Sequence, residues 1–270
     1  MELAAQLESV AIDIVRAAGA LLTKRPAKLN YSTKSSAVDV VTEMDKASEE
    51  LVKNYLATHR PGDGLLGEEG ADVASTTGIT WIVDPIDGTV NYLYGLPGWN
   101  ISIAAQRDGI TLAGAVYAPL LAGGMLWSAT RGGGARLRQG SSGLQEAEPI
   151  AANADVPLHL ALLATGFSYS TQTRVKQGAR IAELIPQVRD IRRMGAAAVD
   201  LCLVASGMVD GYLEEELAPW DLAAGELIAT EAGALVTNAS GDKAGRDMVV
   251  AAHPTLHREI LAALARVAGH

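Results

Sequence analysis

The amino-acid sequence predicts a layered α/β protein built as one compact unit. Its 270 residues can bury a large core, and they fit one large domain or two closely joined halves. Amphipathic segments of helical period alternate with short apolar runs typical of strands, an order that favours sheets packed between helices. There is no internal repeat and no long linker. We therefore expect a single domain over 1–270, with an N-terminal half of about 1–150 and a C-terminal half of about 151–270.

The N-terminal half is expected to hold two helices and then a series of strands. Apolar residues at spacings of three, four or their sums mark the first helix: Leu3, Leu7, Val10, Ile14 and Leu21. This helix should end near Pro26, and Thr42 is a suitable N-cap for a second helix over 42–58. Strand-like apolar runs follow at 80–83, 100–106, 111–117 and 124–129.

A glycine-rich segment, residues 131–143, separates the two halves. It lacks the dinucleotide-binding fingerprint and does not open a helix, so we expect turns at a sheet edge. The C-terminal half then alternates again. Its expected strands lie at 160–164, 190–193, 209–213, 234–237 and 249–251. Its expected helices lie at 175–186, 196–206 and 220–232, and a last one begins at Pro254.

Composition and charge exclude several classes of protein. Lys and Arg number 22 against 31 Asp and Glu, a net charge of −9, which disfavours non-specific binding to nucleic acid or anionic lipid. If the substrate is an anion, a bound divalent cation is the usual means of attracting it. The one cysteine, Cys202, excludes an intramolecular disulfide and a thiolate metal cluster within the chain, and its apolar surroundings indicate a buried helix.

The uncharged stretch 110–129 is long enough for a membrane span but carries breakers. Pro119 and the pair Gly123-Gly124 fall where a spanning helix would need continuity, so two strands joined by a turn are expected. The N-terminus has no basic region followed by an apolar core, so no signal peptide is evident. We expect a soluble, cytoplasmic protein.

Four short motifs place carboxylates close together: Gly67-Glu68-Glu69, Asp84-Pro85-Ile86-Asp87, Glu214-Glu215-Glu216 and Trp220-Asp221-Leu222-Ala223-Ala224-Gly225. Each has an ordinary alternative, since Asp-Pro is a common turn former, a Glu pair can be a solvated loop, and an aspartate at a helix start is a good N-cap. Together they lie at strand ends and helix starts, where α/β sheets place ligands. This placement favours one shared site.

The second motif has the chemistry of a cation site. A short buried strand leads to Asp84, and Pro85 should end the hydrogen-bonded ladder, so that Asp84 and Asp87 fold toward one point. Gly88 permits close approach of the backbone, and the exposed N–H groups around Thr89 could hold an anion. Carboxylates and a carbonyl are the oxygen ligands that Mg²⁺ prefers, at about 2.0–2.1 Å.

The motifs, in this order, resemble the inositol monophosphatase family of Mg²⁺-dependent, lithium-sensitive phosphatases. The resemblance covers nearly the whole chain through Lys34–Asp39, Val41–Asp45, Gly67–Glu69, Trp81–Tyr92, Gly195–Ala198 and Trp220–Gly225. It implies an αβαβα five-layer sandwich of the inositol monophosphatase and fructose-1,6-bisphosphatase type. It also implies a homodimer and a hydrolase that uses two or three Mg²⁺ ions per site.

The resemblance assigns roles to the carboxylates and to Thr89. Glu68, Asp84 and the Ile86 carbonyl would hold the first Mg²⁺, and Asp84, Asp87 and Asp221 the second. Glu69 would belong to the outer shell or to a third, weaker ion.

The implied mechanism is direct attack. A water activated near Glu68 and Thr89 would attack phosphorus without a phospho-enzyme, with Asp45 supporting the Thr89 hydroxyl. The implied substrate-binding residues are Lys34, Asp87, Gly88, Thr89, Ala197 and Glu214. Lys34 has a solvated loop lysine as its alternative.

Details of the motifs bear on the substrate. Val90-Asn91 resembles the inositol type, whereas Ala196 stands where some inositol-specific members carry threonine. Arg136 stands where the family usually has an aromatic residue. Arg192-Arg193 could reach a second phosphate or form a solvated strand end.

The best expectation is a phosphomonoesterase that converts myo-inositol 1-phosphate to inositol and phosphate. Histidinol phosphate and fructose 1,6-bisphosphate are the alternative substrates. A different class of function is a non-catalytic regulatory protein that binds metal or phosphorylated metabolites. The complete set of Glu68, Asp84, Asp87, Thr89 and Asp221 favours catalysis.

Overall fold

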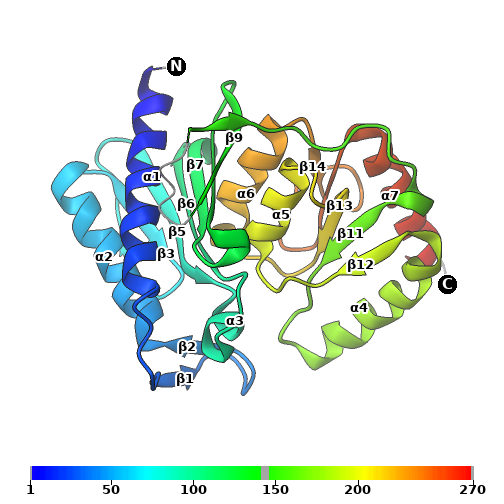
Figure 1. Ribbon diagram of the computed structural model, residues 1–270, viewed down its shortest axis with the longest axis horizontal. Coiled ribbons are helices and arrows are strands. Elements are labelled where there is room, and N and C mark those ends of the chain that lie inside the picture. The colour runs from blue at the N-terminus through cyan, green and yellow to red at the C-terminus, as the bar shows by residue number, and fades with distance from the viewer. Residues whose placement is uncertain (1, 141–145, 269–270) are drawn as a thin grey trace.

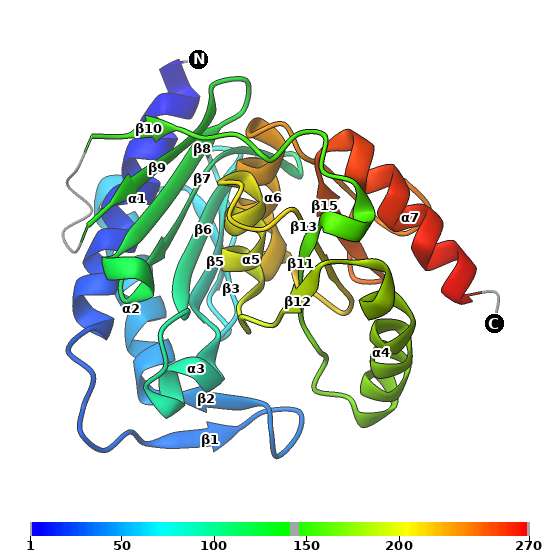
Figure 2. The ribbon, with the colours of Figure 1, turned by 45° about the vertical axis from the view of Figure 1, so that its right-hand side comes forward.

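The computed structural model describes residues 2–140 and 146–268 and has five alternating layers (Figure 1). Helices α1 and α2 cover one face of an eight-stranded sheet, α5 and α6 lie between this sheet and a five-stranded one, and α4 and α7 cover the far side (Figures 1 and 2). The helices are α1 (Glu2–Leu22), α2 (Glu43–His59), α3 (Thr89–Tyr94), α4 (Thr171–Leu184), α5 (Ala197–Ala205), α6 (Pro219–Glu231) and α7 (Pro254–Ala268). This confirms the predicted layered α/β fold.

The first sheet has the strand order β10-β9-β8-β7-β6-β5-β3-β4. Its strands are β3 (Gly64–Gly67), β4 (Asp72–Val73), β5 (Ile79–Asp87), β6 (Asn100–Arg107), β7 (Ile110–Ala118), β8 (Met125–Thr130), β9 (Gly134–Gln139) and β10 (Glu148–Pro149). All four apolar runs expected as strands are present as β5 to β8. The uncharged stretch forms the antiparallel pair β7 and β8, and no helix in the described part of the chain is long and apolar enough to cross a membrane.

The expectation of turns in the glycine-rich segment was wrong over 134–139. These residues form β9, which pairs along its whole length with β8. Ala135 and Leu137 are buried in the core while Arg136 and Arg138 alternate with them, so a strand period is hidden among the glycines. The end of the segment, 141–143, lies outside the described residues.

The second sheet has the order β12-β11-β13-β15-β14. Its strands are β11 (Leu162–Thr165), β12 (Asp190–Arg192), β13 (Gly211–Glu214), β14 (Leu235–Thr237) and β15 (Val249–Ala252). Strands β12, β11 and β13 are parallel, and β15 runs antiparallel to its neighbours. Every strand and helix expected in this half is present, with ends shifted by a few residues.

Several short elements were not predicted. They are the hairpin β1 (Tyr31–Thr33) and β2 (Val40–Thr42), strands β3, β4 and β10, helix α3, and the 3₁₀ turns Leu121–Gly123, Leu158–Leu160 and Ile185–Gln187. Elements of two to six residues are too short to show a clear hydrophobic period. Tertiary contacts therefore decide them.

Three apolar clusters fill the spaces between the layers. One lies between α1, α2 and the first sheet, one around α5 and α6 between the sheets, and one beneath α4 and α7. Cys202 is fully buried in the middle cluster, as the sequence predicted. Close packing there requires small residues: a Cβ added at Gly225 of α6 would lie 2.7 Å from the Leu201 side chain of α5, and one at Gly114 of β7 would lie 3.2 Å from Ala224. Helix α6, which carries Asp221, is thus fixed on both sides.

Candidate metal and phosphate site

Asp84 and Asp87 lie on the same strand, and a bulge brings their side chains together. The expectation that Pro85 ends the ladder was wrong, because strand β5 continues to Asp87. Its register shifts between Asp84, which pairs with Ser102, and Asp87, which pairs with Asn100. In a regular strand, residues three apart face opposite sides of the sheet, and an extra residue reverses that relation. Pro85 is tolerated because the ladder is already interrupted there.

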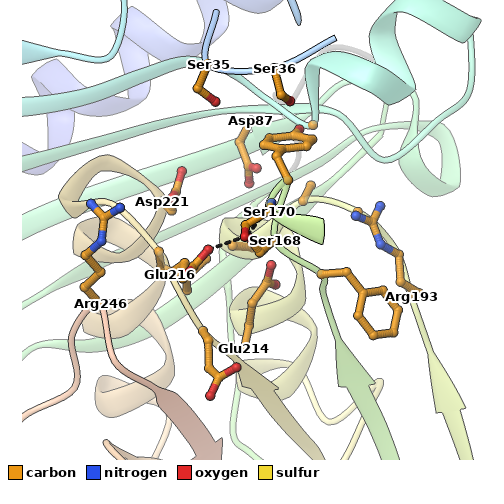
Figure 3. A pocket seen from close by; sticks show the side chains of 18 residues that line it. Ser35, Ser36, Asp87, Ser168, Ser170, Arg193, Glu214, Glu216, Asp221 and Arg246 are labelled. Carbon is orange, nitrogen blue, oxygen red and sulfur yellow. Dashed lines mark hydrogen bonds between the residues drawn. The ribbon is translucent and has the colours of Figure 1, made fainter. Parts of the chain in front are cut away.

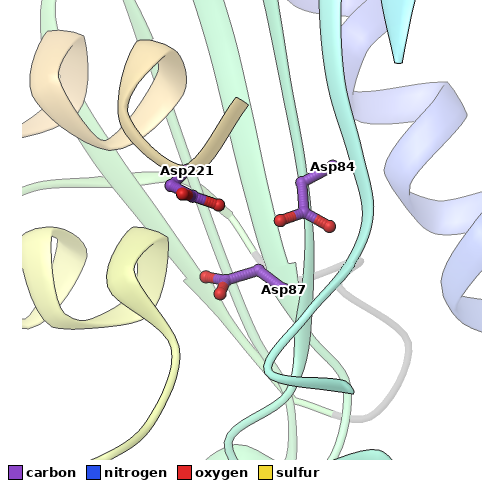
Figure 4. Close-up of side chains that lie close together, drawn as sticks. All are labelled: Asp84, Asp87 and Asp221. Atoms are coloured by element: carbon purple, nitrogen blue, oxygen red, sulfur yellow. The ribbon is translucent and has the colours of Figure 1, made fainter. Parts of the chain in front are cut away.

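The third carboxylate comes from the other half of the chain. Asp221 lies in the first turn of α6, and its Oδ2 accepts a hydrogen bond of 2.7 Å from the Ala218 N–H. Asp221 is therefore not the N-cap of its ordinary alternative, since Ala218 holds that position, but it is the N3 residue whose carboxylate accepts the N–H of the N-cap. It also meets the strand aspartates. One oxygen each of Asp84, Asp87 and Asp221 lies within 4.8 Å of the others, and the side chains converge (Figure 4).

The charged forms of these three carboxylates are destabilised by burial and by one another. Burial raises the pKa of Asp84 well above its usual value, and the charges of Glu68, Asp87 and Asp221 raise it further. Burial likewise raises the pKa of Asp221, and it raises that of Asp87 to about 6 against hydrogen bonds that oppose the shift. Buried like charges of this kind are stabilised by a cation, and an all-oxygen donor set suits a hard divalent ion such as Mg²⁺.

Glu68 and Glu69 are held beside this cluster by a lysine. Lys34 Nζ lies 2.8 Å from a Glu68 oxygen and 2.5 Å from a Glu69 oxygen. Burial of Lys34 lowers its pKa, but the two glutamates outweigh this and raise it overall. Lys34 is therefore an ion-paired lysine in an exposed loop. Glu68, which bonds to it, does not belong to the group of three converging carboxylates.

The turn after Asp87 has the shape of an anion cradle. Gly88 has φ 84° and precedes the first residue of α3, Thr89. A Cβ at Gly88 would also lie 3.1 Å from the Gly195 carbonyl, so only glycine fits this position without strain. The Thr89 hydroxyl oxygen lies 3.1 Å from Asp45 Oδ1 and 3.0 Å from the Ile86 carbonyl, and these two acceptors share its one proton.

Asp45 is fixed by the start of α2. Its Oδ2 accepts hydrogen bonds from the Thr42 N–H at 2.8 Å and the Thr42 hydroxyl at 2.5 Å, and Thr42 is the N-cap that the sequence predicted. Burial raises the pKa of Asp45, although bonds from Thr42 and Thr89 oppose the shift. One buried carboxylate thus connects the helix cap to the Thr89 hydroxyl.

A cavity of about 510 Å³ opens beside the aspartates (Figure 3). Of the expected site residues, it is lined by Asp87, Gly88, Ala197, Glu214 and Asp221. The cavity is also lined by residues that were not among the expected site residues: Ser35, Ser36, Phe167, Ser168, Tyr169, Ser170 and Arg246. Arg193, one of the two arginines whose surroundings the sequence left open, lines it as well. The cavity is large enough for a small phosphate ester.

Glu214, Glu215 and Glu216 all line the cavity, and their hydrogen-bond partners differ. The Oε2 atom of Glu214 accepts a hydrogen bond of 2.6 Å from the Tyr212 hydroxyl. A Cβ added at Gly166 would overlap the same carboxylate, so this position has no room for a side chain. Burial raises the pKa of Glu214 to about 7. Glu215 is ion-paired to Arg180 at 2.8 Å, and Glu216 accepts hydrogen bonds from Ser168 and Thr173.

Sequence reasoning missed residues that hold the aspartates and the Glu68 loop in place. Asp87 Oδ2 accepts 2.9 Å hydrogen bonds from Asn100 Nδ2 and from the Ala198 N–H at the start of α5. Glu49 accepts from the Glu69 N–H at 2.8 Å and the Ala71 N–H at 2.9 Å. No local signal could have identified Glu49, because a glutamate in an amphipathic helix normally faces solvent.

Comparisons with known proteins show which family the chain belongs to. The family model described as "Inositol monophosphatase family" matches residues 3–268. The chain is 46% identical over 243 residues to "Inositol-1-monophosphatase" of Mycobacterium leprae, covering 87% of this chain and 81% of the relative. It is 38% identical to "Nus factor SuhB" of Pasteurella multocida, covering 94% and 93%.

A solved structure has the same fold. "Mycobacterium tuberculosis SuhB" superposes with a TM-score of 0.81 at 40% identity, covering 97% of each chain. The family match spans nearly the whole chain, including both the strand and the helix that supply the aspartates. The protein belongs to the inositol monophosphatase family and is a phosphoric monoester hydrolase.

Proposed function

We propose that the protein is a Mg²⁺-dependent phosphomonoesterase that hydrolyses a small phosphorylated polyol, with myo-inositol 1-phosphate as the expected substrate. The convergence of Asp84, Asp87 and Asp221 beside a cavity of about 510 Å³ is the observation that carries this proposal. The substrate assignment is supported by the "Inositol-1-monophosphatase" relatives and by the Val90-Asn91 motif.

The groups proposed to hold Mg²⁺ are Glu68, Asp84, the Ile86 carbonyl, Asp87 and Asp221, with Glu69 in the outer shell. When bound, Mg²⁺ would polarise the phosphoryl group and lower the pKa of an attacking water. The chain itself supplies an acidic recess that a bare phosphate dianion would not enter unaided, so a bound cation would reconcile the net charge of −9 with an anionic substrate.

Thr89 and Asp45 are proposed to move the proton of the attacking water. The Thr89 hydroxyl oxygen accepts that proton while it passes its own to Asp45 Oδ1, 3.1 Å away. The raised pKa of Asp45 makes its carboxylate a stronger base than one in water. The water oxygen bonds to phosphorus as the bond between phosphorus and the alcohol oxygen breaks, and the alcohol oxygen takes up a proton from solvent water. Glu68 is the second carboxylate expected beside the attacking water.

The remaining site residues are proposed to orient the ester. The N–H groups of Gly88 and Thr89 hold phosphate oxygens at the start of α3. Glu214 and Ala197 contact the alcohol half, with Glu214 accepting a substrate hydroxyl. Lys34 positions Glu68 and Glu69 through its two ion pairs.

Two alternatives are kept. Histidinol phosphate and fructose 1,6-bisphosphate are the other candidate substrates within the class. A regulatory, non-catalytic function is favoured by one observation, the name "Nus factor SuhB" of relatives that are 36–38% identical. The presence of all four carboxylates proposed to hold Mg²⁺, Glu68, Asp84, Asp87 and Asp221, favours catalysis over the regulatory function.

Phosphate release tests the proposal. Purified protein should release phosphate from myo-inositol 1-phosphate, and less from histidinol phosphate or fructose 1,6-bisphosphate, in the presence of Mg²⁺ and not in EDTA. Release from none of the three by folded, Mg²⁺-supplied protein would move the weight to the regulatory alternative.

Family resemblance adds three further proposals. We expect a cytoplasmic enzyme, inhibition by lithium, and a homodimer. In light scattering after size exclusion, the dimer would have twice the 28.1 kDa mass of the chain. A mass of one chain at micromolar concentration would contradict the homodimer.

A further inference from the structure

The loop between β13 and α6 contains a residue in an unusual backbone conformation. Glu216 has φ 67°, in the left-handed region that favours glycine. Four residues other than glycine adopt such a φ in the described part of the chain, and of these four only Glu216 lines the cavity beside the aspartates. Its N–H donates a hydrogen bond of 2.6 Å to the Arg246 carbonyl, which fixes the turn. A strained residue at the wall of a cavity indicates a function for the side chain that it carries.

The Glu216 carboxylate joins this loop to the segment that follows β11. Its Oε2 accepts a hydrogen bond from the Ser168 hydroxyl (Figure 3). Its Oε1 accepts a hydrogen bond of 2.9 Å from the Thr173 hydroxyl. Both carboxylate oxygens are therefore bound by the protein, so Glu216 is suited to position a segment of the chain and not to bind a ligand.

Ser168 lies at the centre of the segment Phe167–Ser170, which forms one wall of the cavity. The Ser168 hydroxyl accepts a hydrogen bond of 2.9 Å from the Ser170 N–H, and Ser170 is the N-cap of α4. The Ser168 carbonyl accepts one of 2.5 Å from Arg174 Nε. These bonds connect the segment to α4, whereas the Glu216 carboxylate connects it to the loop after β13.

This bridge joins the carboxyl ends of two adjacent parallel strands. Strand β11 ends at Thr165 and β13 at Glu214, and Thr165 pairs with Leu213. In α/β sheets, ligands bind beyond the carboxyl ends of the strands. Gly166 has no room for a side chain beside the Glu214 carboxylate, so the two segments approach closely there. The bridge therefore closes the wall around the residue proposed to accept a substrate hydroxyl.

The bridge is separate from the groups proposed to hold metal and phosphate. Among the described residues, none of the three converging aspartates is hydrogen-bonded to Glu216, Ser168 or Thr173. Loss of the bridge should therefore loosen the wall on the alcohol side and leave the aspartates in place.

We propose that Glu216 is a positioning residue that holds the segment Phe167–Ser170 against Glu214 and so builds the wall that binds the alcohol half of the substrate. This inference rests on the proposed phosphatase function and adds to it a residue that sets the affinity for the alcohol. The left-handed backbone keeps the carboxylate directed at Ser168 and Thr173, and the two hydrogen bonds compensate for the strain.

Glu216→Gly tests this role, because glycine adopts φ 67° without strain while the bridge is lost. With myo-inositol 1-phosphate and Mg²⁺, KM should rise about 10-fold, the lower end of the contribution of a hydrogen bond to a charged group. The value of kcat should stay close to that of the wild type, as expected when binding is weakened equally in the ground state and the transition state. The inhibition constant of inorganic phosphate, which lacks the alcohol half, should not change. In EDTA, amide hydrogen exchange over 167–170 should be faster than in the wild type.

Two further variants test whether Glu216 acts through the segment and not by touching the substrate. Glu216→Gln keeps the chain length and one acceptor oxygen, so its KM should lie between those of Glu216→Gly and the wild type. Thr173→Ala removes one partner of the bridge at a residue that does not line the cavity. It should raise KM in the same direction by a smaller factor, and an unchanged KM in Thr173→Ala would contradict action through the bridge.

Glu231→Ala is the matched control. Glu231, the last residue of α6, accepts hydrogen bonds of 2.7 and 2.9 Å from the N–H groups of Gly132 and Gly134, so it is another glutamate bridge with two bonds, and it does not line the cavity. Its KM, its inhibition by phosphate and its exchange over 167–170 should equal those of the wild type.

Three outcomes would overturn the inference while phosphate release by the wild type leaves the phosphatase proposal standing. They are an unchanged KM in Glu216→Gly, an equal rise of KM in Glu231→Ala, and an equal weakening of inhibition by inorganic phosphate in Glu216→Gly. Absence of Mg²⁺-dependent release by the wild type would overturn both proposals together.

Discussion

The residues that recruit the cation are costly to the fold when no cation is bound. Asp84 is 1% exposed and Asp87 7%, and one carboxylate oxygen of each lies within 4.8 Å of one of Asp221. Burial and mutual repulsion raise the pKa of Asp84 and of Asp221, so each ionised carboxylate opposes folding at neutral pH. A binding site for Mg²⁺ is therefore also a local source of instability.

Asp84→Asn is expected to separate these two effects. It should lower kcat/KM by more than about 100-fold, because outer-shell partners of a metal alone are worth about 10- to 100-fold. It should also raise the melting temperature of the metal-free protein, because one buried charge is removed. Steady-state kinetics and thermal melting in EDTA measure the two quantities. Asp190→Asn, at an exposed position, is the control, and retained turnover in Asp84→Asn would refute the proposed role.

Glu214 makes stability depend on pH in a defined direction. Its pKa is raised by burial from an ordinary 4.5 to about 7, so the folded state binds the proton more tightly than the unfolded state. The stability this contributes is complete below about pH 4.5 and is lost as pH rises through about 7.

Glu214→Gln should remove that dependence. The unfolding free energy of the variant minus that of the wild type should increase by up to about 3 kcal/mol between pH 4 and pH 8. Urea titrations in EDTA at pH 4, 6 and 8 measure this, with Glu215→Gln as the control on the neighbouring residue. If the unfolding free energies of Glu214→Gln and the wild type changed with pH in parallel, the raised pKa of the buried Glu214 carboxyl would be contradicted.

At the scale of elements, α6 connects the two sheets and positions Asp221. Gly225 lies against Leu201 of α5, and Gly114 of β7 lies against Ala224. Glycine is normally unfavourable in a helix by about 1 kcal/mol relative to alanine, so Gly225 is explained by the close approach of two helices and not by propensity. These contacts fix α6 against α5 and β7.

Gly225→Ala is therefore expected to destabilise a helix that alanine would otherwise favour. The added Cβ would lie 2.7 Å from the Leu201 side chain, and overpacking of this kind costs about 1–3 kcal/mol. Gly178→Ala in α4 is the matched control, since no heavy atom lies within 4 Å of its Cβ, and it should stabilise by up to about 1 kcal/mol. Unfolding in denaturant measures the change in unfolding free energy for each of the two variants. Equal changes of the same sign would contradict the packing explanation.

At the scale of the whole molecule, the site joins elements from both halves of the chain. Asp84 and Asp87 come from the first sheet, Asp221 from α6, and Asp87 is also bonded to the Ala198 N–H of α5. A cation bound there crosslinks these elements in the folded state and has no equivalent site in the unfolded chain. Stability should therefore depend on Mg²⁺ concentration across the whole cooperative unit.

Added Mg²⁺ is expected to raise the melting temperature. At 100 times its dissociation constant a single bound ion adds about 2.7 kcal/mol to the unfolding free energy. Differential scanning calorimetry from zero to millimolar Mg²⁺ measures the shift, and Asp84→Asn should show little of it. A wild-type transition that stays flat over this range would contradict the metal site.

The sequence by itself determined the layered fold class, the type of nearly every long element, and the carboxylates that form the site. Apolar periods in 3–21 and in the strands β5 to β8 are local, and the motif around Asp84 and Asp87 carries its chemistry in four residues. The strand β9 was missed because glycines obscured its alternation. Such signals depend on neighbours a few positions apart, which is why they are visible without a structure.

Only the tertiary structure decided which side chains meet. The bulge that turns Asp84 and Asp87 to one side is a property of pairing with β6, and Asp87 receives the Ala198 N–H from 111 residues away. Arg192 is ion-paired to Asp190 while Arg193 lines the cavity, and this difference is likewise invisible in two identical letters. Contacts across such separations arise from packing of layers, where burial and close approach select positions that no local period records.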